Sequence, residues 1–368
     1  MGRADFLYSG FISRLAYQPT SCQDGLLRKV ADFVCSDDDD ILVVNGYAGT
    51  GKTTAVAAVI SLLKEYKTKC VLLAPTGRAA KVLSSYAGQQ AYTIHKHIYR
   101  QKSVGGDGFG QFSLYPNKDK STLFVVDEAS MISGVRDNPT FGSGLLLDDL
   151  IRYVYSGEGC SILLLGDDAQ LPPVNSDISP ALDEDYLSGY CLDIQSFTLT
   201  HVARQALDSG VLYNATNLRT KVADLHASFD YHFASDFHQL EGGDFVEKLE
   251  ESYREVGLED TLILTRTNLR TNRYNQGVRA RLLWKEDVIS SGDRLMISKN
   301  NYFWTKDYDN LPFLANGDMM EIVRLRNERE MYGFHFVDAA LRAIDYDWEI
   351  DVMLWLDTLT TDSPEANY

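Results

Sequence analysis

The sequence is poor in cysteine and has no long apolar run, and each shortage excludes a class of protein. Its 368 residues include five cysteines, which are widely spaced and form no Cys-x-x-Cys pair, so neither a zinc site nor a disulfide framework is expected. No apolar run is long enough to cross a membrane, and Arg3, Asp5 and Arg14 interrupt the segment where a secretory signal would lie. We therefore expect a cytoplasmic protein with free thiols and no membrane partner.

Basic residues are outnumbered, and the net charge at pH 7 is −17. Taken as a whole, so acidic a chain is a poor match for nucleic acid. Two stretches nevertheless contain no Asp or Glu while Lys and Arg recur in them, and these are Tyr66–Gly106 and Thr261–Lys285. A run of like charge is usually a solvated face. Two such stretches in an acidic chain nevertheless favour a positively charged groove for a nucleic-acid backbone.

The segment Gly46–Thr53 matches the phosphate-binding pattern G-x-x-x-x-G-K-[ST] at every constrained position. An apolar run at Ile41–Val44 precedes it and a helix-like run at Thr54–Leu63 follows, which is the strand, loop and helix order of such a site. The alternative is a glycine-rich turn that binds nothing. In the favoured interpretation, Lys52 binds the β- and γ-phosphates and the Thr53 hydroxyl holds Mg²⁺. The predicted nucleotide contacts are Gly46, Ala48, Gly49, Thr50, Gly51, Lys52, Thr53 and Thr54.

Two carboxylates follow a second buried apolar run. Leu123–Val126 leads directly into Asp127 and Glu128, and open α/β sheets bind ligands at this carboxyl edge. Asp127 would hold Mg²⁺ through water, and Glu128 would polarise the attacking water. Gln170 follows another apolar run, where its amide could bond a γ-phosphate and lose that bond after hydrolysis. The pair of acids favours hydrolysis over phosphoryl transfer to another molecule.

The first half of the chain alternates short apolar strands with helix-like or loop segments. The expected strands are Ile41–Val44, Val71–Ala74, Leu123–Val126 and Ile162–Leu165. This alternation predicts an α/β fold with a doubly wound parallel sheet. Between the second and third strands, Ile98–Tyr115 shows two alternating arms around a glycine-rich turn, which predicts a projecting β-hairpin.

The second half differs in texture. Thr261–Leu264 resembles one more buried strand, and the Arg- and Asn-rich run Asn268–Leu283 resembles a helix, so we expect the beginning of a second α/β domain. From Gly292 onward, short β-type runs are separated by Asn-Gly, Gly-Asp and Tyr-Gly turns. They predict a small antiparallel β unit.

Two further segments, Pro75–Arg78 and Thr93–Lys96, combine small residues, hydroxyls and basic side chains. Such residues suit a grip on a sugar–phosphate chain that reads no bases. The alternative is that both are ordinary helix starts with their caps. Taken with the phosphate loop, Asp127–Ser130, Gly166–Val174 and Ala74–Ala80, they make the chain resemble the superfamily 1 DNA helicases. Within these it is most similar to the 5′-to-3′ branch 1B, the RecD (exonuclease V alpha subunit) and Dda-like enzymes.

The resemblance implies an ATP-dependent helicase or translocase on single-stranded DNA, with ATP and Mg²⁺ as cofactors and a RecA-like P-loop NTPase fold. It implies a motor domain at 1–200 with a pin hairpin at about 98–120, a partial second RecA-like domain at 201–290, and an SH3-like β insertion at 291–368. The partners implied are single-stranded DNA and the duplex fork, together with subunits of a repair or recombination complex. We expect the protein itself to be a monomer.

The resemblance also assigns roles to single residues. Gln23 matches the glutamine that reads adenine, and Arg204 matches the arginine that contacts the γ-phosphate, whose loss typically costs about 10³-fold or more in rate. The hairpin occupies the place of the pin that splits the duplex, with Phe109, Phe112 and Tyr115 as candidates to stack on the terminal base pair. The predicted DNA contacts are Pro75, Thr76, Gly77, Arg78, Thr93, His95, Lys96, Phe109, Phe112, Arg266 and Asn268.

The chain departs from the family in one respect. Two motifs of the second motor domain, a DNA-binding segment and one with a second catalytic arginine, are not found before Tyr368. We therefore expect the N-terminal part of a helicase that binds ATP, turns it over poorly and unwinds weakly or not at all. Two alternatives remain, an ATP-binding regulatory subunit that does not unwind and a phosphotransferase acting on a small molecule.

Overall fold

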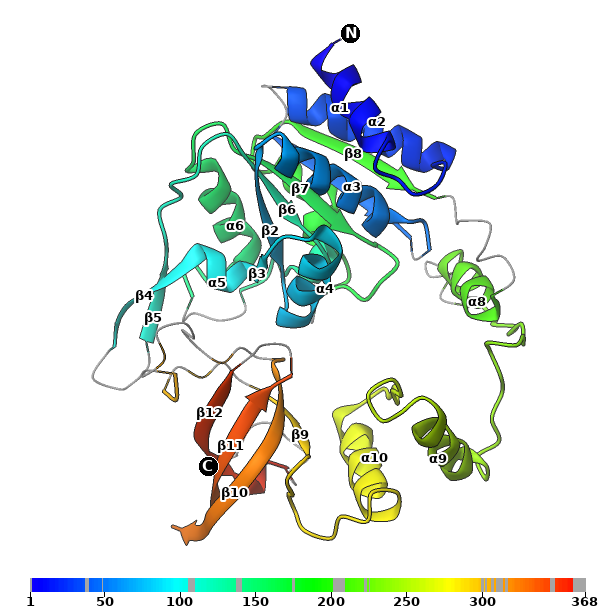
Figure 1. Cartoon of the computed structure of the whole chain (residues 1–368), viewed down its shortest axis with the longest axis vertical. Coiled ribbons are helices and arrows are strands. Elements are labelled where there is room, and N and C mark those ends of the chain that lie inside the picture. The colour runs from blue at the N-terminus through cyan, green and yellow to red at the C-terminus, as the bar shows by residue number, and fades with distance from the viewer. Residues whose placement is uncertain are drawn as a thin grey trace. The chain divides into compact units, whose positions relative to one another are not determined.

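The computed structural model describes residues 2–36, 40–47, 49–104, 110–136, 141–173, 176–200, 209–221, 224, 226–298, 301, 303–305, 308, 314, 317–344 and 348–359. The chain forms two compact units, Met1–Phe237 and His238–Tyr368, each with a sheet of its own (Figure 1). Within the described residues, no helix combines the length and the apolar character that a bilayer crossing needs.

The first unit is built on a six-stranded sheet in which every strand pairing is parallel. In spatial order its strands are β3 (Ala91–Thr93), β2 (Lys69–Ala74), β6 (Thr122–Val126), β7 (Ser161–Gly166), β1 (Ile41–Gly46) and β8 (Ile194–Leu199). The four strands expected from the sequence are β1, β2, β6 and β7, and they form the buried middle of the sheet. The predicted α/β fold with a parallel sheet is confirmed.

Helices cover both faces of this sheet. They are α1 (Arg3–Ile12), α2 (Ser21–Cys35), α3 (Lys52–Glu65), α4 (Gly77–Ala87), α5 (Ile94–Ile98), α6 (Leu146–Tyr155) and α7 (Glu184–Ser188), with short 3₁₀ turns η1 (Ala129–Met131) and η2 (Pro180–Leu182). Helix α8 (Gly210–Arg219) follows β8 along the chain. Because side chains alternate along a strand, Leu123 and Val125 join the core beneath α1 to α4. Phe124 between them meets Tyr153 of α6 with ring centroids 6.0 Å apart, so β6 is buried on both faces.

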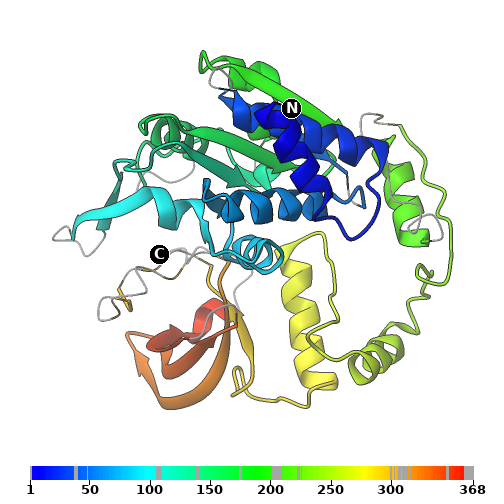
Figure 2. The same ribbon diagram turned by 45° about the horizontal axis from the view of Figure 1, so that its top comes forward.

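The insertion between β3 and β6 is the predicted hairpin. Strands β4 (Tyr99–Val104) and β5 (Gly110–Leu114) pair antiparallel, with Tyr99 opposite Leu114 and a register shift between Gln101 and Ser103. The arms project from the first unit in both views (Figures 1 and 2). The hairpin prediction is confirmed for the two arms, while the turn at 105–109 lies outside the described residues.

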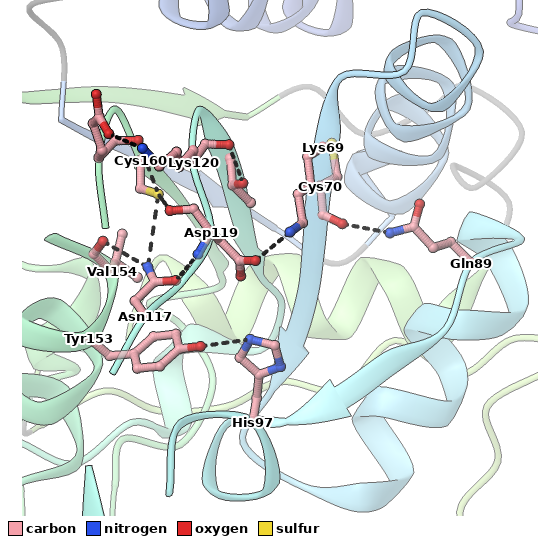
Figure 3. A network of polar contacts seen from close by, with 12 residues as sticks. Lys69, Cys70, Gln89, His97, Asn117, Asp119, Lys120, Tyr153, Val154 and Cys160 are labelled. Carbon is pink, nitrogen blue, oxygen red and sulfur yellow. Dashed lines mark hydrogen bonds and ion pairs between the residues drawn. The ribbon is translucent and has the colours of Figure 1, made fainter. Parts of the chain in front are cut away.

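A polar network fixes the chain where it returns from the hairpin to the sheet (Figure 3). The Asn117 side-chain amide donates to the Val154 carbonyl at 3.1 Å, and its oxygen accepts from the backbone N–H of Asp119 at 2.9 Å. The Asp119 carboxylate pairs with Lys69 at the start of β2. Nearby, the Tyr153 hydroxyl lies 3.4 Å from Nε2 of His97, whose pKa is lowered by burial. Hydrogen bonds and an ion pair therefore fix the segment that follows the hairpin to β2 and α6.

The second unit contains the predicted antiparallel β unit. Its sheet has the order β12 (Glu349–Trp355), β11 (Phe334–Ala343), β10 (Met319–Met331) and β9 (Arg294–Met296), followed by the 3₁₀ turn η4 (Leu356–Leu359). All pairings are antiparallel, and β10 has two register shifts, which bend a long strand. Met320, Ile322, Leu341 and Ile350 are buried between its strands and turns. Helices α9 (Phe245–Glu255) and α10 (Asn268–Arg281) precede this sheet.

One predicted strand is wrong. Thr261–Leu264 forms no strand, and Leu262 and Leu264 are 76% and 86% exposed. A short β-rich run is stable only when neighbouring strands satisfy its backbone groups, and Thr261–Leu264 pairs with none. The helix predicted to follow is present as α10, but it buries no residue. The division into three domains stays a prediction.

Candidate nucleotide-binding site

The phosphate loop connects β1 to α3 at the carboxyl edge of the sheet. Gly51 is the N-cap of α3 with φ +76°, and a Cβ there would lie 2.1 Å from Nε2 of Gln23. Only glycine fits both the left-handed backbone and the missing space. The loop is closed by Thr50, whose N–H and hydroxyl both donate to the Tyr47 carbonyl at 3.3 and 2.7 Å. Ala48, a predicted contact, lies outside the described residues.

Lys52 begins α3 and points across the sheet edge. Its Nζ donates to the carbonyl of Gly166 at 2.7 Å and to that of Gly46 at 3.3 Å. The ammonium is thus held between the ends of β1 and β7. Triphosphate oxygens are stronger acceptors for a cation than neutral carbonyls, so a bound nucleotide would take over this ammonium.

Gln23 braces the loop from α2. It is 2% exposed, its Nε2 donates to the Thr50 carbonyl at 3.0 Å, and its Oε1 accepts from the N–H of Thr20 at 3.0 Å. The Thr20 hydroxyl accepts in turn from the N–H of Gln23, which completes a capping box. Both ends of the amide are therefore bonded to the protein. The adenine-reading role of Gln23 stays a prediction.

Asp127 and Glu128 follow β6 at the same edge. The N–H of Asp127 donates to the Leu73 carbonyl at 3.0 Å, and its Oδ1 accepts from the N–H of Glu128 at 3.0 Å. Glu128 has φ +53°, a conformation that a residue with a Cβ adopts at a cost of about 1–3 kcal/mol and that often marks a functional site. Burial and the neighbouring Asp127 raise the pKa of Glu128, while Lys52 acts to lower it. These side chains therefore interact electrostatically.

Tyr86 is a neighbour of this acid pair that the sequence patterns did not single out. It lies in the last turn of α4, and its hydroxyl donates to Oδ2 of Asp127. Burial and the carboxylate beside it raise the pKa of Tyr86, so the phenol stays protonated and remains a donor. Tyr86 and Asp127 stand 41 residues apart in the chain, and no motif connects them.

Gln170 lies in the turn after β7. Its side chain is exposed, and its N–H donates to the Asp167 carbonyl at 3.1 Å. Asp167, at 2% exposure, organises this turn by accepting from the N–H of Ala169 at 3.0 Å. Asn45 of β1 accepts from the N–H of Asp168 at 3.0 Å. The turn is therefore tied to the strand that carries the phosphate loop.

A second missed residue, Arg219, reaches the loop from the last turn of α8. Its guanidinium lies 3.9 Å from the centroid of the Tyr47 ring. Such a cation–π contact contributes about 0.5–2 kcal/mol. Arg204, which the resemblance placed at the γ-phosphate, lies outside the described residues.

The residues present fit a nucleotide-bound magnesium ion. The Thr53 side chain is exposed on the first turn of α3, and Asp127 offers a carboxylate after β6, which is separated from β1 in the sheet by β7. Mg²⁺ prefers oxygen ligands and keeps several waters while binding one or two protein groups together with substrate phosphates. Where the chain is described, no cluster of three or more His, Cys, Asp or Glu could hold a metal by itself.

The predicted DNA contacts of the first unit start two helices beside the same sheet edge. The hydroxyl of Thr76 caps α4 by accepting from the N–H of Ala79 at 3.2 Å, and that of Thr93 caps α5 by accepting from the N–H of Lys96 at 3.2 Å. Arg78 and Lys96 are exposed, Pro75 is half-buried, and Gly77 is buried. Both hydroxyls thus have the cap role that was the alternative, and the exposed cations next to them remain available.

Two of the side chains predicted to contact DNA, His95 and Phe112, pack against Phe141. The His95 ring packs 5.1 Å from that of Phe141 and is half-buried. Phe112 is 7% exposed and stacks on Phe141 at 4.8 Å, so the expectation that it meets a terminal base pair is corrected. Its carbonyl also accepts from the N–H of Gly142 at 2.9 Å. Phe109 lies outside the described residues, and the half-buried Tyr115 has the Arg100 guanidinium 4.9 Å from its ring centroid.

Replacing Phe112 with alanine is therefore expected to destabilise the first unit rather than weaken DNA binding. The cavity left by a buried aromatic ring should lower the free energy of unfolding by about 3 kcal/mol, measured by urea denaturation. The half-exposed Phe6, which meets Tyr66 edge to face at 5.4 Å, serves as control, and Phe6→Ala should cost about 1 kcal/mol or less. A Phe112→Ala protein of normal stability that binds an oligonucleotide poorly would contradict the corrected placement.

The second basic stretch is displayed on α10 of the second unit. Arg266 and Asn268 at its start are exposed, and Arg270, Arg273 and Tyr274 line a shallow hollow of about 280 Å³. Further along, Arg279 and Lys285 both pair with Asp293, at 2.9 and 2.7 Å. Arg270 and Arg273 therefore place positive charge on the first half of α10, and one carboxylate offsets part of the charge near its end.

Comparison with known proteins adds to this geometry. The AAA_30 family, an AAA domain, matches residues 28–228. The ATP-dependent RecD2 DNA helicase of Deinococcus radiodurans is 32% identical over 178 residues, which is 48% of this chain and 21% of that protein. The ATP-dependent DNA helicase Dda of Enterobacteria phage T4 is 24% identical over 302 residues, or 77% of this chain and 62% of that one. The chain thus spans less than two thirds of either relative.

A search of solved structures gives the Pif1 helicase from Candida albicans, which aligns with 92% of this chain and 79% of its own at 16% identity and a TM-score of 0.36.

Proposed function

Because this chain belongs to the AAA_30 family of AAA domains and is a RecD- and Dda-like relative within helicase superfamily 1B, we propose that it couples ATP hydrolysis to movement along single-stranded DNA. The observation that carries the proposal is the joint placement of Lys52, Asp127 and Glu128 at one sheet edge. Lys52 bonds the end of β7 at 2.7 Å and acts on the pKa of Glu128, as does Asp127. A cation for phosphate and a base for water thus share one site.

In this proposal Lys52 binds the β- and γ-phosphates and Glu128 accepts a proton from the attacking water. Held by Thr53 and Asp127, Mg²⁺ would neutralise charge on the phosphate oxygens. Gln170 faces the γ-phosphate, and Arg204 stabilises the charge that develops during its transfer. Gln23 reads the adenine once the nucleotide has rearranged its bonds to Thr50 and Thr20.

We propose that DNA lies across the starts of α4 and α5, where Thr76, Arg78, Thr93 and Lys96 contact its sugar–phosphate backbone. In the second unit, the exposed arginines of α10 would bind DNA phosphates by themselves. Binding through phosphates is tolerant of sequence and weakens steeply with salt. The direction of movement is 5′ to 3′, and the β4–β5 hairpin acts as the pin at the fork. These two points rest on the resemblance to RecD- and Dda-like helicases.

The 368-residue chain by itself is proposed to be a weak motor. In the helicases that the chain resembles, ATP binds in a cleft between two RecA-like domains, and the cleft closes around it. The described part of the second unit contains an antiparallel sheet and no parallel one. In this proposal, hydrolysis by the chain is slow and unwinding is weak.

ATP hydrolysis with and without oligo(dT) tests the proposal. We expect a low basal rate that oligo(dT) raises severalfold, with stimulation lost as salt increases. A chain that binds ATP and DNA but shows no stimulation would instead be an ATP-dependent clamp, which overturns the motor. Duplexes with a 5′ or a 3′ single-stranded tail then test direction, and robust processive unwinding would contradict the weak-motor proposal.

A further inference from the structure

Tyr86 engages the carboxylate that we propose as a magnesium ligand. Its hydroxyl donates to Oδ2 of Asp127, while the N–H of Glu128 donates to Oδ1 at 3.0 Å. A carboxylate has about four lone-pair sites on its two oxygens, so each oxygen keeps an acceptor site for metal-bound water. The two donors therefore set the direction of the carboxylate without exhausting it.

The helix that carries Tyr86 begins at the segment proposed to hold DNA. α4 has 11 residues, with Thr76 as N-cap, and Arg78 in its first turn is exposed. Its Leu83 and Ala80 are buried in the core between the sheet and helices α1 to α4, and Tyr86 packs partly against the same core. An α-helix of this length is a stiff rod of about 16 Å. A shift of its first turn is consequently felt at Tyr86.

We propose that Tyr86 is a positioning residue that orients Asp127 for the metal and connects α4, and through it bound DNA, to the ATP site. The proposal rests on the proposed function. Groups that hold a metal ligand in place typically change metal affinity or activity by about 10- to 100-fold when removed. A backbone N–H on one oxygen alone leaves the carboxylate free to rotate about its Cβ–Cγ bond. The phenol on the other oxygen prevents that rotation.

The variant Tyr86→Phe tests this role because it removes only the hydroxyl. Its matched control is Tyr190→Phe, since the Tyr190 hydroxyl donates to Asp148 of α6 in the same way but contacts none of the proposed ATP ligands. With the full 368-residue chain, binding of a fluorescent ATP analogue is measured while Mg²⁺ is titrated, with and without oligo(dT). Thermal melting followed by circular dichroism establishes that both variants are folded.

We expect Tyr86→Phe to raise the half-saturating Mg²⁺ concentration about tenfold and to leave binding without Mg²⁺ unchanged. In the parent chain and in Tyr190→Phe, oligo(dT) should lower the half-saturating Mg²⁺ concentration, and Tyr86→Phe should lose this response. An unchanged Mg²⁺ dependence in Tyr86→Phe overturns the positioning role. A shifted dependence that still responds fully to oligo(dT) overturns the connection through α4. A parent chain that binds no nucleotide contradicts the proposed function itself, and this inference with it.

Discussion

Replacing Lys52 with alanine is expected to abolish ATP hydrolysis while leaving the affinity for single-stranded DNA unchanged. The ammonium is the one cation that the phosphate loop itself provides, and the structure holds it between the Gly46 and Gly166 carbonyls. Removing a preorganised donor from developing charge costs about 10²–10³-fold in rate. The loss here should reach at least that range, because the group carries a full charge. Steady-state ATPase assays with oligo(dT) and anisotropy of a labelled oligonucleotide measure the two quantities.

The same helix provides a matched control. Lys64 lies in the last turn of α3, where its Nζ donates to the Gly88 carbonyl at 2.8 Å, away from the phosphate loop. Lys64→Ala should keep the parent rate of hydrolysis. If Lys52→Ala hydrolysed ATP at the parent rate, the assignment of the nucleotide site would be wrong. If it lost DNA binding as well, the proposed separation of the two sites would fail.

The middle of the first sheet could be predicted because its strands are buried on both faces. Such strands show as continuous apolar runs, as Phe124 and its neighbours do. The edge strands were missed because they are not buried in this way. β3 has only three residues, and β8 alternates half-buried and exposed side chains. An edge strand pairs with one neighbouring strand only and is exposed to solvent along its other edge, so it is often shorter and less apolar.

The opposite error at Thr261–Leu264 shows the limit of a local pattern. A β-rich run forms a strand only if another strand lies beside it. The sequence of four residues does not indicate which strand that would be. Phe112 makes the same point for a side chain. Alternation along β5 indicates that it faces one side, but the ring that covers it belongs to Phe141, far along the chain. Only the tertiary structure determines which face of a hairpin is buried from solvent.

The proposed catalytic residues were easier to find than their neighbours. Lys52 and Glu128 occur in sequence motifs that are typical of nucleotide-binding sites. By contrast, Tyr86 and Arg219 reach the site from helices whose sequences carry no such constraint. A residue that acts through another residue needs only the right distance in space. Contacts of this kind are therefore found from a structure and not from a pattern.

Replacing Glu128 with glutamine is expected to stop hydrolysis while preserving ATP binding. The amide has nearly the shape of the carboxylate, and so it should tolerate the same backbone at φ +53°, but it cannot accept the proton of the attacking water. Loss of a general base costs about 10²–10⁴-fold in rate. Binding of a fluorescent ATP analogue should be equal or tighter, because a negative charge next to the phosphates is removed. Glu158→Gln, which alters an exposed ion pair with Lys120, should leave both quantities unchanged.

The pH dependence of the rate provides the sharper part of this test. Burial and Asp127 raise the pKa of Glu128 above its ordinary value, so the base becomes protonated at a higher pH than an exposed glutamate would. Hydrolysis by the parent chain should therefore fall as the pH is lowered through this raised pKa, while ATP stays bound. Residual hydrolysis by Glu128→Gln should lack that acid limb. An acid limb of the same shape in both proteins would show that another group is the base.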